Sequence, residues 1–341
     1  MPSATPTSTT PPSRARRNRL WLVGQLAVTA VVLWYVGKAL VKQWREFSDH
    51  PLTINADWPV LGASVLVVLV TYALLVETWR RIVINWESTR RPARFGFWTA
   101  ARIWSISNLG RYVPGKVWQI GAMATLAERA GISAVAAAGS SILNVIVNIS
   151  TGFLVALIAG WRSFDALSRG YTTVGVVLVV VVMAGVLLLP TALPILLDAA
   201  RRMTGKPLAI GTVPHRAVYL AIVGNVAAWL LYGAAFQLFV RGVTGQATGT
   251  FANYVTAWAW PYIFGYLAFF VPGGLVVRET TLTLSLGVLQ LATPQTAIVI
   301  AVTSRLWLTL TELLPGLIFL ALGWGGRGRG SNSTNGQTSN D

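Results

Sequence analysis

Long apolar runs alternate with short polar segments along most of the chain, and the lengths of these runs predict its secondary structure. An α-helix rises about 1.5 Å per residue, so about 20 apolar residues cross the hydrocarbon core of a bilayer. Runs of this length recur from residue 20 to residue 324. We expect uninterrupted spanning helices over residues 20–41, 58–79, 132–160, 172–197, 217–240 and 294–324.

Two further apolar stretches, 95–126 and 250–291, contain a break that an uninterrupted spanning helix would not choose. The break is Val-Pro-Gly, at 113–115 in the first stretch and at 271–273 in the second. Proline withholds a backbone donor, and glycine permits unusual dihedral angles. We therefore expect each stretch to form two half-helices. Irregular backbone of this kind is tolerated inside a membrane where it lines a cavity.

The order of these elements repeats, which predicts an internal duplication. Each half holds two spans, one broken segment and a closing helix, and the closing helices end alike, in LVALIAGW at 154–161 and LIFLALGW at 317–324. Both ends of the chain have the composition of disordered tails. The expected division is a basic N-terminal tail, a first membrane repeat, a second membrane repeat and a C-terminal tail, at 1–19, 20–160, 161–324 and 325–341.

The basic clusters decide between two topologies, because Lys and Arg are enriched in the cytoplasmic loops of membrane proteins. These clusters stand at 14–19, 80–94 and 201–216 and in the C-terminal tail. Eight full spans, the alternative, would place the cluster at 201–216 outside the cell. Six spans with two re-entrant broken segments place every cluster and both termini in the cytoplasm. We therefore expect a multi-pass cell-membrane protein of two inverted repeats, each with three spanning helices and one re-entrant segment.

Composition excludes a soluble protein. Hydrophobic residues make up 54% of the 341 and charged residues 11%, and the mean hydropathy is +0.59, which indicates an all-α, membrane-integral fold. The net charge of +16 comes from residues at the ends of apolar runs, where they meet lipid headgroups, so we expect no nucleic-acid partner. With no cysteine and two histidines, we expect no metal site and no cofactor.

Six of the charged residues within the predicted membrane segments are candidates for a site, because an ion at the bilayer centre costs about 2.5 to 3.5 kcal/mol on insertion scales. They therefore need a partner or a wet cavity. The six are Arg111, Lys116, Arg278, Glu279, Arg305 and Glu312. Arg305 lies about ten residues, or roughly 15 Å, into its predicted helix, close to the bilayer centre. The alternative to a ligand contact is a structural ion pair of Arg305 with Glu279 or Glu312.

The two breaks are candidate anion sites. Each leaves helix ends whose free N–H groups can bind an anion, and a lipid phosphate is the simplest anion in a membrane. The residues of the breaks are Pro114, Gly115, Pro272 and Gly273. Arg111 and Lys116 flank the first break, and Arg278 and Glu279 follow the second. For Arg111 and Lys116 the alternative is that both side chains extend to lipid headgroups at the interface.

Polar residues follow helical spacing on one face of each closing helix. They are Ser141, Asn144, Asn148 and Thr151 on the first, and Arg305, Thr309 and Glu312 on the second. Asn144 and Asn148 have two open interpretations, hydrogen bonds between packed helices or contacts with a substrate. Trp258, Trp260, Tyr262 and Tyr266 are a further candidate lining for a lipid path, and the alternative is the usual interfacial place of such residues.

Three stretches, NLGRYVPGKVW at 108–118, VPGGLVVRE at 271–279 and residues 305–315, resemble the lysylphosphatidylglycerol synthase transmembrane-region family. This family includes the flippase half of the multiple peptide resistance factor and stand-alone relatives, and it is associated with moving polar lipids between leaflets. The resemblance implies lipid translocation, with the matching positions Arg111, Pro114, Gly115, Lys116, Pro272, Gly273, Arg278 and Glu279. Larger members also carry a soluble aminoacyltransferase domain. No stretch here is long and polar enough to be one, so we do not expect lysine transfer.

The leading hypothesis is a lipid flippase or translocation component for an anionic, aminoacylated or glycosylated lipid, which a separate enzyme would make. The chain has no GxxxxGK[ST] pattern, so we expect no nucleotide-binding loop. One alternative is an integral membrane transferase that acts on a lipid-linked donor, with Asp49 and Asp57 as its acid–base candidates. Another alternative is a non-transporting scaffold for an envelope-lipid enzyme. We expect no catalytic residue in the membrane site itself.

Overall fold

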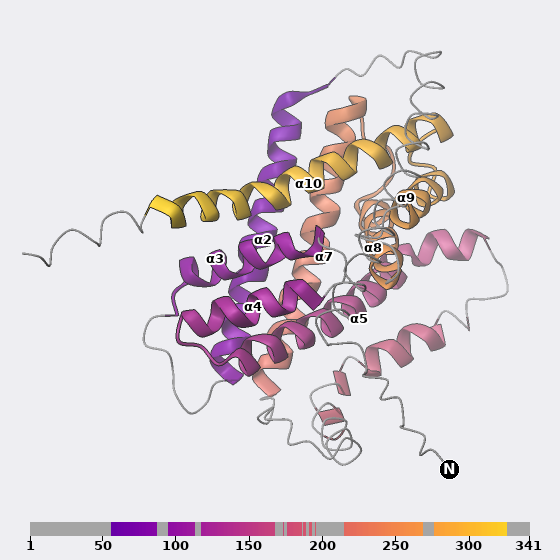
Figure 1. Cartoon of the computed structure of the whole chain (residues 1–341). Coiled ribbons are helices and arrows are strands. Elements are labelled where there is room, and N and C mark those ends of the chain that lie inside the picture. Colours follow the sequence, from indigo (N-terminus) through magenta and orange to yellow (C-terminus); the bar gives the residue numbers. More distant parts are fainter. Residues whose placement is uncertain are drawn as a thin grey trace, which may run out of the picture. The chain divides into compact units, whose positions relative to one another are not determined.

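The computed structural model describes residues 56–86, 95–112, 117–167, 215–268 and 276–325, together with Val176–Gly185 and a few isolated positions between 173 and 195. Among these residues all regular structure is helical, without a strand, which confirms the all-α class. The elements are α2 (Trp58–Trp86), α3 (Phe97–Asn108), the 3-10 helix η1 (Leu109–Tyr112), α4 (Val117–Arg129), α5 (Ala134–Leu167), α7 (His215–Thr244), α8 (Phe251–Leu267), α9 (Val277–Val288) and α10 (Pro294–Gly325) (Figure 1).

Four of these helices are long and apolar enough to cross a membrane. The candidate spans are Trp58–Trp86, Ala136–Trp161, His215–Thr244 and Pro294–Leu322. Large apolar side chains such as Leu66, Val223 and Leu310 are exposed on them, as lipid-facing residues are. The chain is therefore an all-helical protein with the features of a membrane protein. The predicted span 20–41, the predicted N-terminal tail and residues 326–341 lie outside the described residues. Of the predicted span 172–197, the structure describes the apolar helix Val176–Gly185 and a few isolated positions.

Two predicted helix ends are wrong: α5, predicted to end at 160, continues to Leu167, and α2 is also longer than predicted. The basic loop was expected to begin at Arg80, but α2 continues to Trp86 and carries both Arg80 and Arg81. Glu77 explains the longer helix, because its carboxylate accepts hydrogen bonds from Arg80 Nε at 2.7 Å and Arg81 Nε at 2.6 Å, one turn further on. Arg80 Nη1 also donates to the carbonyl of Phe95 at 3.1 Å and so ties α2 to the start of α3.

Both broken stretches are interrupted as predicted. The first holds α3, η1 and α4, and the second holds α8 and α9. The Val-Pro-Gly breaks themselves fall within 113–116 and 269–275, outside the described residues. Just before α9, Val276 has a φ of 70°, a left-handed conformation that is strained for a β-branched residue.

The central helices α2 and α7 pack against each other and run antiparallel. Leu61, near the start of α2, lies against Gly242 near the end of α7, while Thr78 lies against Gly224 at the opposite ends. The backbone N–H of Asp57 donates to the carbonyl of Gly242 at 2.9 Å. A methyl group at position 224 would collide with Thr78, so glycine permits the close approach of the two helices.

The remaining helices pack across the two halves of the sequence. The half-helix α3 lies along α10 (Figure 1), and α8 packs on α5. Gly316 of α10 faces the backbone carbonyl of Ser105, and Phe153 of α5 meets Trp260 of α8 edge to face at 5.2 Å between ring centroids. The second half-helices complete the arrangement, because α4 packs on α5 and α9 packs on α10.

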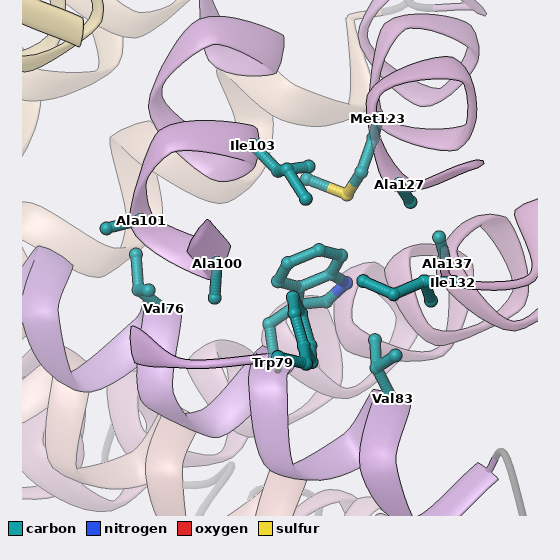
Figure 2. Close-up of a cluster of buried hydrophobic side chains, with 11 residues drawn as sticks. Val76, Trp79, Val83, Ala100, Ala101, Ile103, Met123, Ala127, Ile132 and Ala137 are labelled. Atoms are coloured by element: carbon teal, nitrogen blue, oxygen red, sulfur yellow. The ribbon is translucent and has the colours of Figure 1, made fainter. Parts of the chain in front are cut away.

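An apolar cluster around Trp79 fixes the first broken segment to α2. Figure 2 shows the indole of Trp79 among Ile103 of α3, Met123 of α4 and Ile132 before α5. The Trp79 side chain is 0% exposed. Because lipid tails are as apolar as these side chains, tight van der Waals packing holds such a cluster together in a membrane. The cluster therefore positions α3 and α4 for the site described below.

Candidate functional site

A cavity of about 160 Å³ lies among α3, α4, α5, α8, α9 and α10. Its volume is about five times what one water molecule occupies in the liquid. The lining residues are Trp104, Gln119, Ile120, Met123, Ser141, Asn144, Val145, Tyr262, Gly265, Tyr266, Arg278, Arg305, Leu308, Thr309 and Glu312. These residues come from the broken segment and the closing helix of each half, whereas α2 and α7 contribute no residue to the lining.

Two arginines and a glutamate form a charged cluster at this cavity. Arg278 on α9 is buried, with 4% of its surface exposed, and its guanidinium carbon lies 4.9 Å from the ring centroid of Trp258. Arg278 Nη1 and Arg305 Nη1 each lie 3.7 Å from the same oxygen, Oε1 of Glu279. Arg305 thus forms the ion pair with Glu279 that was predicted as one of its two interpretations, and it also lines the cavity.

The cluster keeps unused hydrogen-bonding capacity. Arg278 Nε and Nη1 and both carboxylate oxygens of Glu279 are buried and have no hydrogen-bond partner among the described residues. A charge-assisted hydrogen bond is about 2.7 to 2.9 Å long, so separations of 3.7 Å are ion pairs without one. Buried polar groups without a partner are costly and rare. Such donors beside a cavity are suited to receive an oxyanion.

All three residues of the polar stripe predicted on the second closing helix, α10, face the cavity. Arg305, Thr309 and Glu312 all line it, together with Leu308. Arg305 lies about 16 Å along α10 from Pro294, near the middle of a candidate span. Charges at this depth require a polar environment, and the cavity provides it.

The stripe predicted on the first closing helix divides between two roles. Ser141 and Asn144 line the cavity, whereas Asn148 and Thr151 do not belong to its lining. Asn148 Nδ2 donates to Asn225 Oδ1 on α7 at 2.8 Å, and Asn225 Nδ2 donates to Asn144 Oδ1 at 2.9 Å. Asn148 therefore makes the helix-packing contact that was one of its two interpretations. Asn144 makes such a contact and also faces the cavity.

Sequence reasoning missed several residues of the site. Gln119 lines the cavity and donates through Nε2 to Asn108 Oδ1 at 2.6 Å. Asn225 lies behind Asn144. The sequence feature that could have identified Asn225 is its position in the middle of an apolar span, where polar side chains are rare. Of the four aromatic candidates, Tyr262 and Tyr266 line the cavity and stack on each other with ring centroids 6.5 Å apart.

The structure brings together only part of the predicted site. Asn144, Arg278, Glu279, Arg305 and Glu312 meet at or beside the cavity. The break residues Pro114, Gly115, Lys116, Pro272 and Gly273 lie outside the described residues, as does the side chain of Arg111. Their assignment to the site stays a prediction. No group of three metal-ligating side chains occurs among the residues that the structure describes.

Comparison with known proteins gives no match: no protein family, no curated protein and no solved structure is similar enough to this chain to be assigned to it. The resemblance to the lysylphosphatidylglycerol synthase transmembrane-region family therefore rests on the sequence motifs, and stays an expectation. Among the described residues, the fold and the cavity define an all-helical protein with helices long and apolar enough to span a membrane and with a cavity lined by charged residues.

Proposed function

We propose that this protein moves a polar lipid between the leaflets of the cell membrane, as a flippase or as part of a translocation system. One observation carries the proposal: buried Arg278 presents hydrogen-bond donors without partners beside a cavity in the membrane region. The lipid carries a phosphate or a similar oxyanion, and its headgroup is anionic, aminoacylated or glycosylated. A separate enzyme supplies the lipid, and no cofactor takes part.

The cavity suits a headgroup rather than a whole lipid. A volume of about 160 Å³ is too small for acyl chains, which stay among the exposed apolar side chains of the spanning helices. The oxyanion binds the guanidinium groups of Arg278 and Arg305, whose planar donors match phosphate oxygens. Because an ion in bare hydrocarbon is costly, such a site lowers the barrier for the headgroup at mid-membrane.

The packing supports an inverted repeat. In an inverted duplication, equivalent helices of the two halves run antiparallel, whereas in a direct duplication they run parallel. The equivalent helices α2 and α7 are antiparallel, with Leu61 against Gly242 and Thr78 against Gly224. The contacts between the halves are also equivalent. The first half-helix of each broken segment packs on the closing helix of the other half, α3 on α10 and α8 on α5. We therefore propose three spans and one re-entrant segment in each half.

This topology places both termini in the cytoplasm, and the absence of cysteine makes that testable. A single cysteine is introduced at Thr5 or at Thr334, and cells are treated with a membrane-impermeant maleimide. Both variants should react only after the cells are opened. Labelling of either variant in intact cells would reject six spans with cytoplasmic ends.

The transferase alternative is not favoured by the described residues. Asp57 Oδ1 accepts a hydrogen bond from the backbone N–H of Val60 at 3.3 Å, as a residue at the start of a helix does. Asp57 is thus an N-terminal cap of α2. Asp49, the other acid–base candidate, lies outside the described residues. The scaffold alternative gives no reason for Arg278 and Arg305 to lie at a cavity.

Leaflet exchange in vesicles that contain the purified full chain tests the proposal. A fluorescent phosphatidylglycerol in the inner leaflet is protected from dithionite, so its rate of bleaching reports movement between leaflets. Wild-type protein should accelerate bleaching, and Arg278→Gln should return the rate to that of protein-free vesicles. Arg241→Gln is the control, because Arg241 is exposed in the last turn of α7, away from the cavity lining.

Labelled aminoacylated and glycosylated lipids are tested in parallel, since the proposal covers these classes. Acceleration of any one of them that depends on Arg278 would support the proposal and identify the class. If the wild-type protein accelerates none of them above protein-free vesicles, the proposal is rejected.

A further inference from the structure

Three asparagine side chains form a hydrogen-bonded chain that connects α7 to the cavity wall. Asn148 Nδ2 donates to Asn225 Oδ1 at 2.8 Å, and Asn225 Nδ2 donates to Asn144 Oδ1 at 2.9 Å. Asn225 Nδ2 also donates to the backbone carbonyl of Ala221 at 2.8 Å. Of the three asparagines, Asn144 alone belongs to the cavity lining.

The carbonyl of Ala221 determines the direction of this chain. A backbone carbonyl can only accept, so Asn225 must present its NH₂ group on the side of Ala221 and Asn144. Asn144 must then accept with Oδ1, because two NH₂ groups cannot bond to each other. Its own NH₂ group forms no bond among the described residues and is the polar group that Asn144 offers to the cavity. Asn144 is thereby held as a donor.

A second contact from α7 braces the same wall. Trp229, one turn beyond Asn225, donates through Nε1 to the backbone carbonyl of Asn148 at 3.0 Å. Its indole packs on Gly152, where a methyl group would overlap the ring, and meets the cavity-lining Tyr262 edge to face at 5.3 Å between centroids. The Asn225 side chain is 0% exposed, so it has little freedom to turn.

The other amide pair of the cavity is different. Gln119 donates to Asn108, but among the described hydrogen bonds neither side chain is held by a backbone carbonyl. Both amides can therefore turn together and exchange donor for acceptor. Asn144 lacks this freedom, because Ala221 and Asn225 together decide which of its two polar groups faces the cavity.

We propose that Asn225 is a positioning residue that holds Asn144 as a hydrogen-bond donor, so that the site selects ligands with a second acceptor oxygen besides the oxyanion at Arg278. This inference rests on the proposed function and refines its ligand class. The ligand is a phosphate ester that also carries a carbonyl or hydroxyl oxygen. A lipid headgroup and a small soluble phosphate ester share this chemistry.

Binding of dioctanoyl phosphatidylglycerol to the purified full chain in detergent, measured by titration calorimetry, tests the inference. Asn225→Asp is the first variant, measured at a pH at which the new side chain is ionised, because a carboxylate can only accept and cannot donate to Ala221 or to Asn144. Asn144 then turns its NH₂ group toward Asp at 225 and presents Oδ1 to the ligand. Affinity should fall about tenfold or more, as expected for a hydrogen bond to a charged or strongly polar ligand group.

A double-mutant cycle separates positioning from a general structural effect. Asn144→Ala should weaken binding by a similar factor, and Asn225→Asp should then change affinity by less than about twofold in the Asn144→Ala background. If the fold-losses in affinity of the two single variants multiply in the double variant, Asn225 acts independently of Asn144 and the inference is overturned. Asn225→Leu, which adds no buried charge, repeats the cycle if Asn225→Asp does not fold.

Thr151→Val is the matched control. Thr151 lies on the same face of α5, but among the described residues its hydroxyl bonds only to the carbonyls of Val147 and Asn148 in its own helix. The substitution removes a buried polar group without touching Asn144, and affinity should stay within about twofold of wild type. A tenfold loss here would mean that any polar change in this face weakens binding, and it would overturn the inference.

Two further results distinguish the inference from the function on which it rests. If Arg278→Gln abolishes binding while Asn144→Ala and Asn225→Asp do not weaken it, the inference fails and the proposed function stands. If neither Arg278→Gln nor Asn144→Ala weakens binding, both fail. Glycerol 3-phosphate is titrated in a parallel experiment. If Asn225→Asp weakens the binding of both glycerol 3-phosphate and the lipid, a phosphate ester is sufficient as the ligand. If Asn225→Asp weakens the binding of the lipid alone, the ligand is the lipid headgroup.

Discussion

Arg305 and Glu279 form an ion pair between α10 and α9, with Arg305 Nη1 3.7 Å from Glu279 Oε1. Arg278 Nη1 lies at the same distance from the same oxygen, so two guanidinium groups share one carboxylate. These three groups carry a net positive charge and make no short hydrogen bond to one another. Arg278 Nε and Nη1 have no hydrogen-bond partner among the described residues, so an oxyanion can bind to them without displacing one, which is the basis of the first prediction.

Glu279→Gln should destabilise the protein and make its stability depend on anions. Without the Glu279 carboxylate, two arginines remain close together in a partly buried site, with the acidic residue Glu312 in the cavity lining. Breaking a fully buried pair costs about 3 to 5 kcal/mol, and we expect about 2 kcal/mol here, because the Glu279 side chain is 21% exposed. Thermal unfolding in detergent checks this, and inorganic phosphate should raise the melting temperature of the variant more than that of wild type.

The control for this experiment is Glu128→Gln, since Glu128 is exposed at the end of α4. Its melting temperature should stay close to wild type with and without phosphate. An unchanged melting temperature for Glu279→Gln, or equal effects of phosphate on both variants, would contradict a charge cluster at the cavity.

Cysteine pairs should report the antiparallel packing of α2 and α7. The chain has no cysteine of its own, so introduced pairs are the only ones that can cross-link. Leu61→Cys with Gly242→Cys should form a disulfide under mild oxidation, because the two positions are in contact. Leu61→Cys with Val223→Cys, at the other end of α7, should not. Cross-linking of the second pair in preference to the first, read by gel mobility after proteolysis between the helices, would indicate parallel packing.

Gly224→Ala should destabilise the pair of central helices. An added methyl group at this position overlaps the side chain of Thr78, and overpacking of this kind costs about 1 to 3 kcal/mol. Thr78→Ala in the same chain should restore most of the loss by making room. Gly62→Ala on α2 is the control, because nothing lies within 4 Å of the added atom and alanine is the better helix former. A melting temperature of Gly224→Ala equal to that of Gly62→Ala would argue against this contact.

Asp57→Asn should leave both stability and leaflet exchange unchanged. Asparagine caps a helix as well as aspartate does, and Asp57 accepts a hydrogen bond at the start of α2. Asp57→Ala should instead cost about 1 kcal/mol, which thermal unfolding measures. Loss of lipid chemistry in Asp57→Asn at full stability would revive the transferase alternative.

Local patterns were sufficient for the helices and for part of the site. The interruptions of 95–126 and 250–291 follow from Pro and Gly in apolar runs, whose effect on the backbone is local. The stripe of Arg305, Thr309 and Glu312 follows from helical spacing within one element. The end of α2 was misplaced because Arg80 and Arg81 were interpreted as loop residues, whereas their hydrogen bonds with Glu77 extend the helix.

The site as a whole could not be assembled from such patterns. Asn225 was not predicted, because its importance lies in contacts with Asn144 and Asn148, on a helix distant in sequence. Gln119 was missed for a related reason: its partner Asn108 lies across the first break. Nothing in the order of residues distinguishes an amide that faces lipid from one that faces another helix.

By itself, the sequence determined the all-helical fold with membrane-span helices, the interruption of two apolar stretches and the face of α10 that carries charge. Each of these depends on composition, proline and glycine, or a helical period, which act over a few residues. Only the tertiary structure decided that Glu279 lies between Arg278 and Arg305, that α2 and α7 run antiparallel, and that Asn225 holds Asn144 at the cavity. These relationships depend on which helix surfaces pack together, and packing is set by the shapes of side chains far apart in the chain.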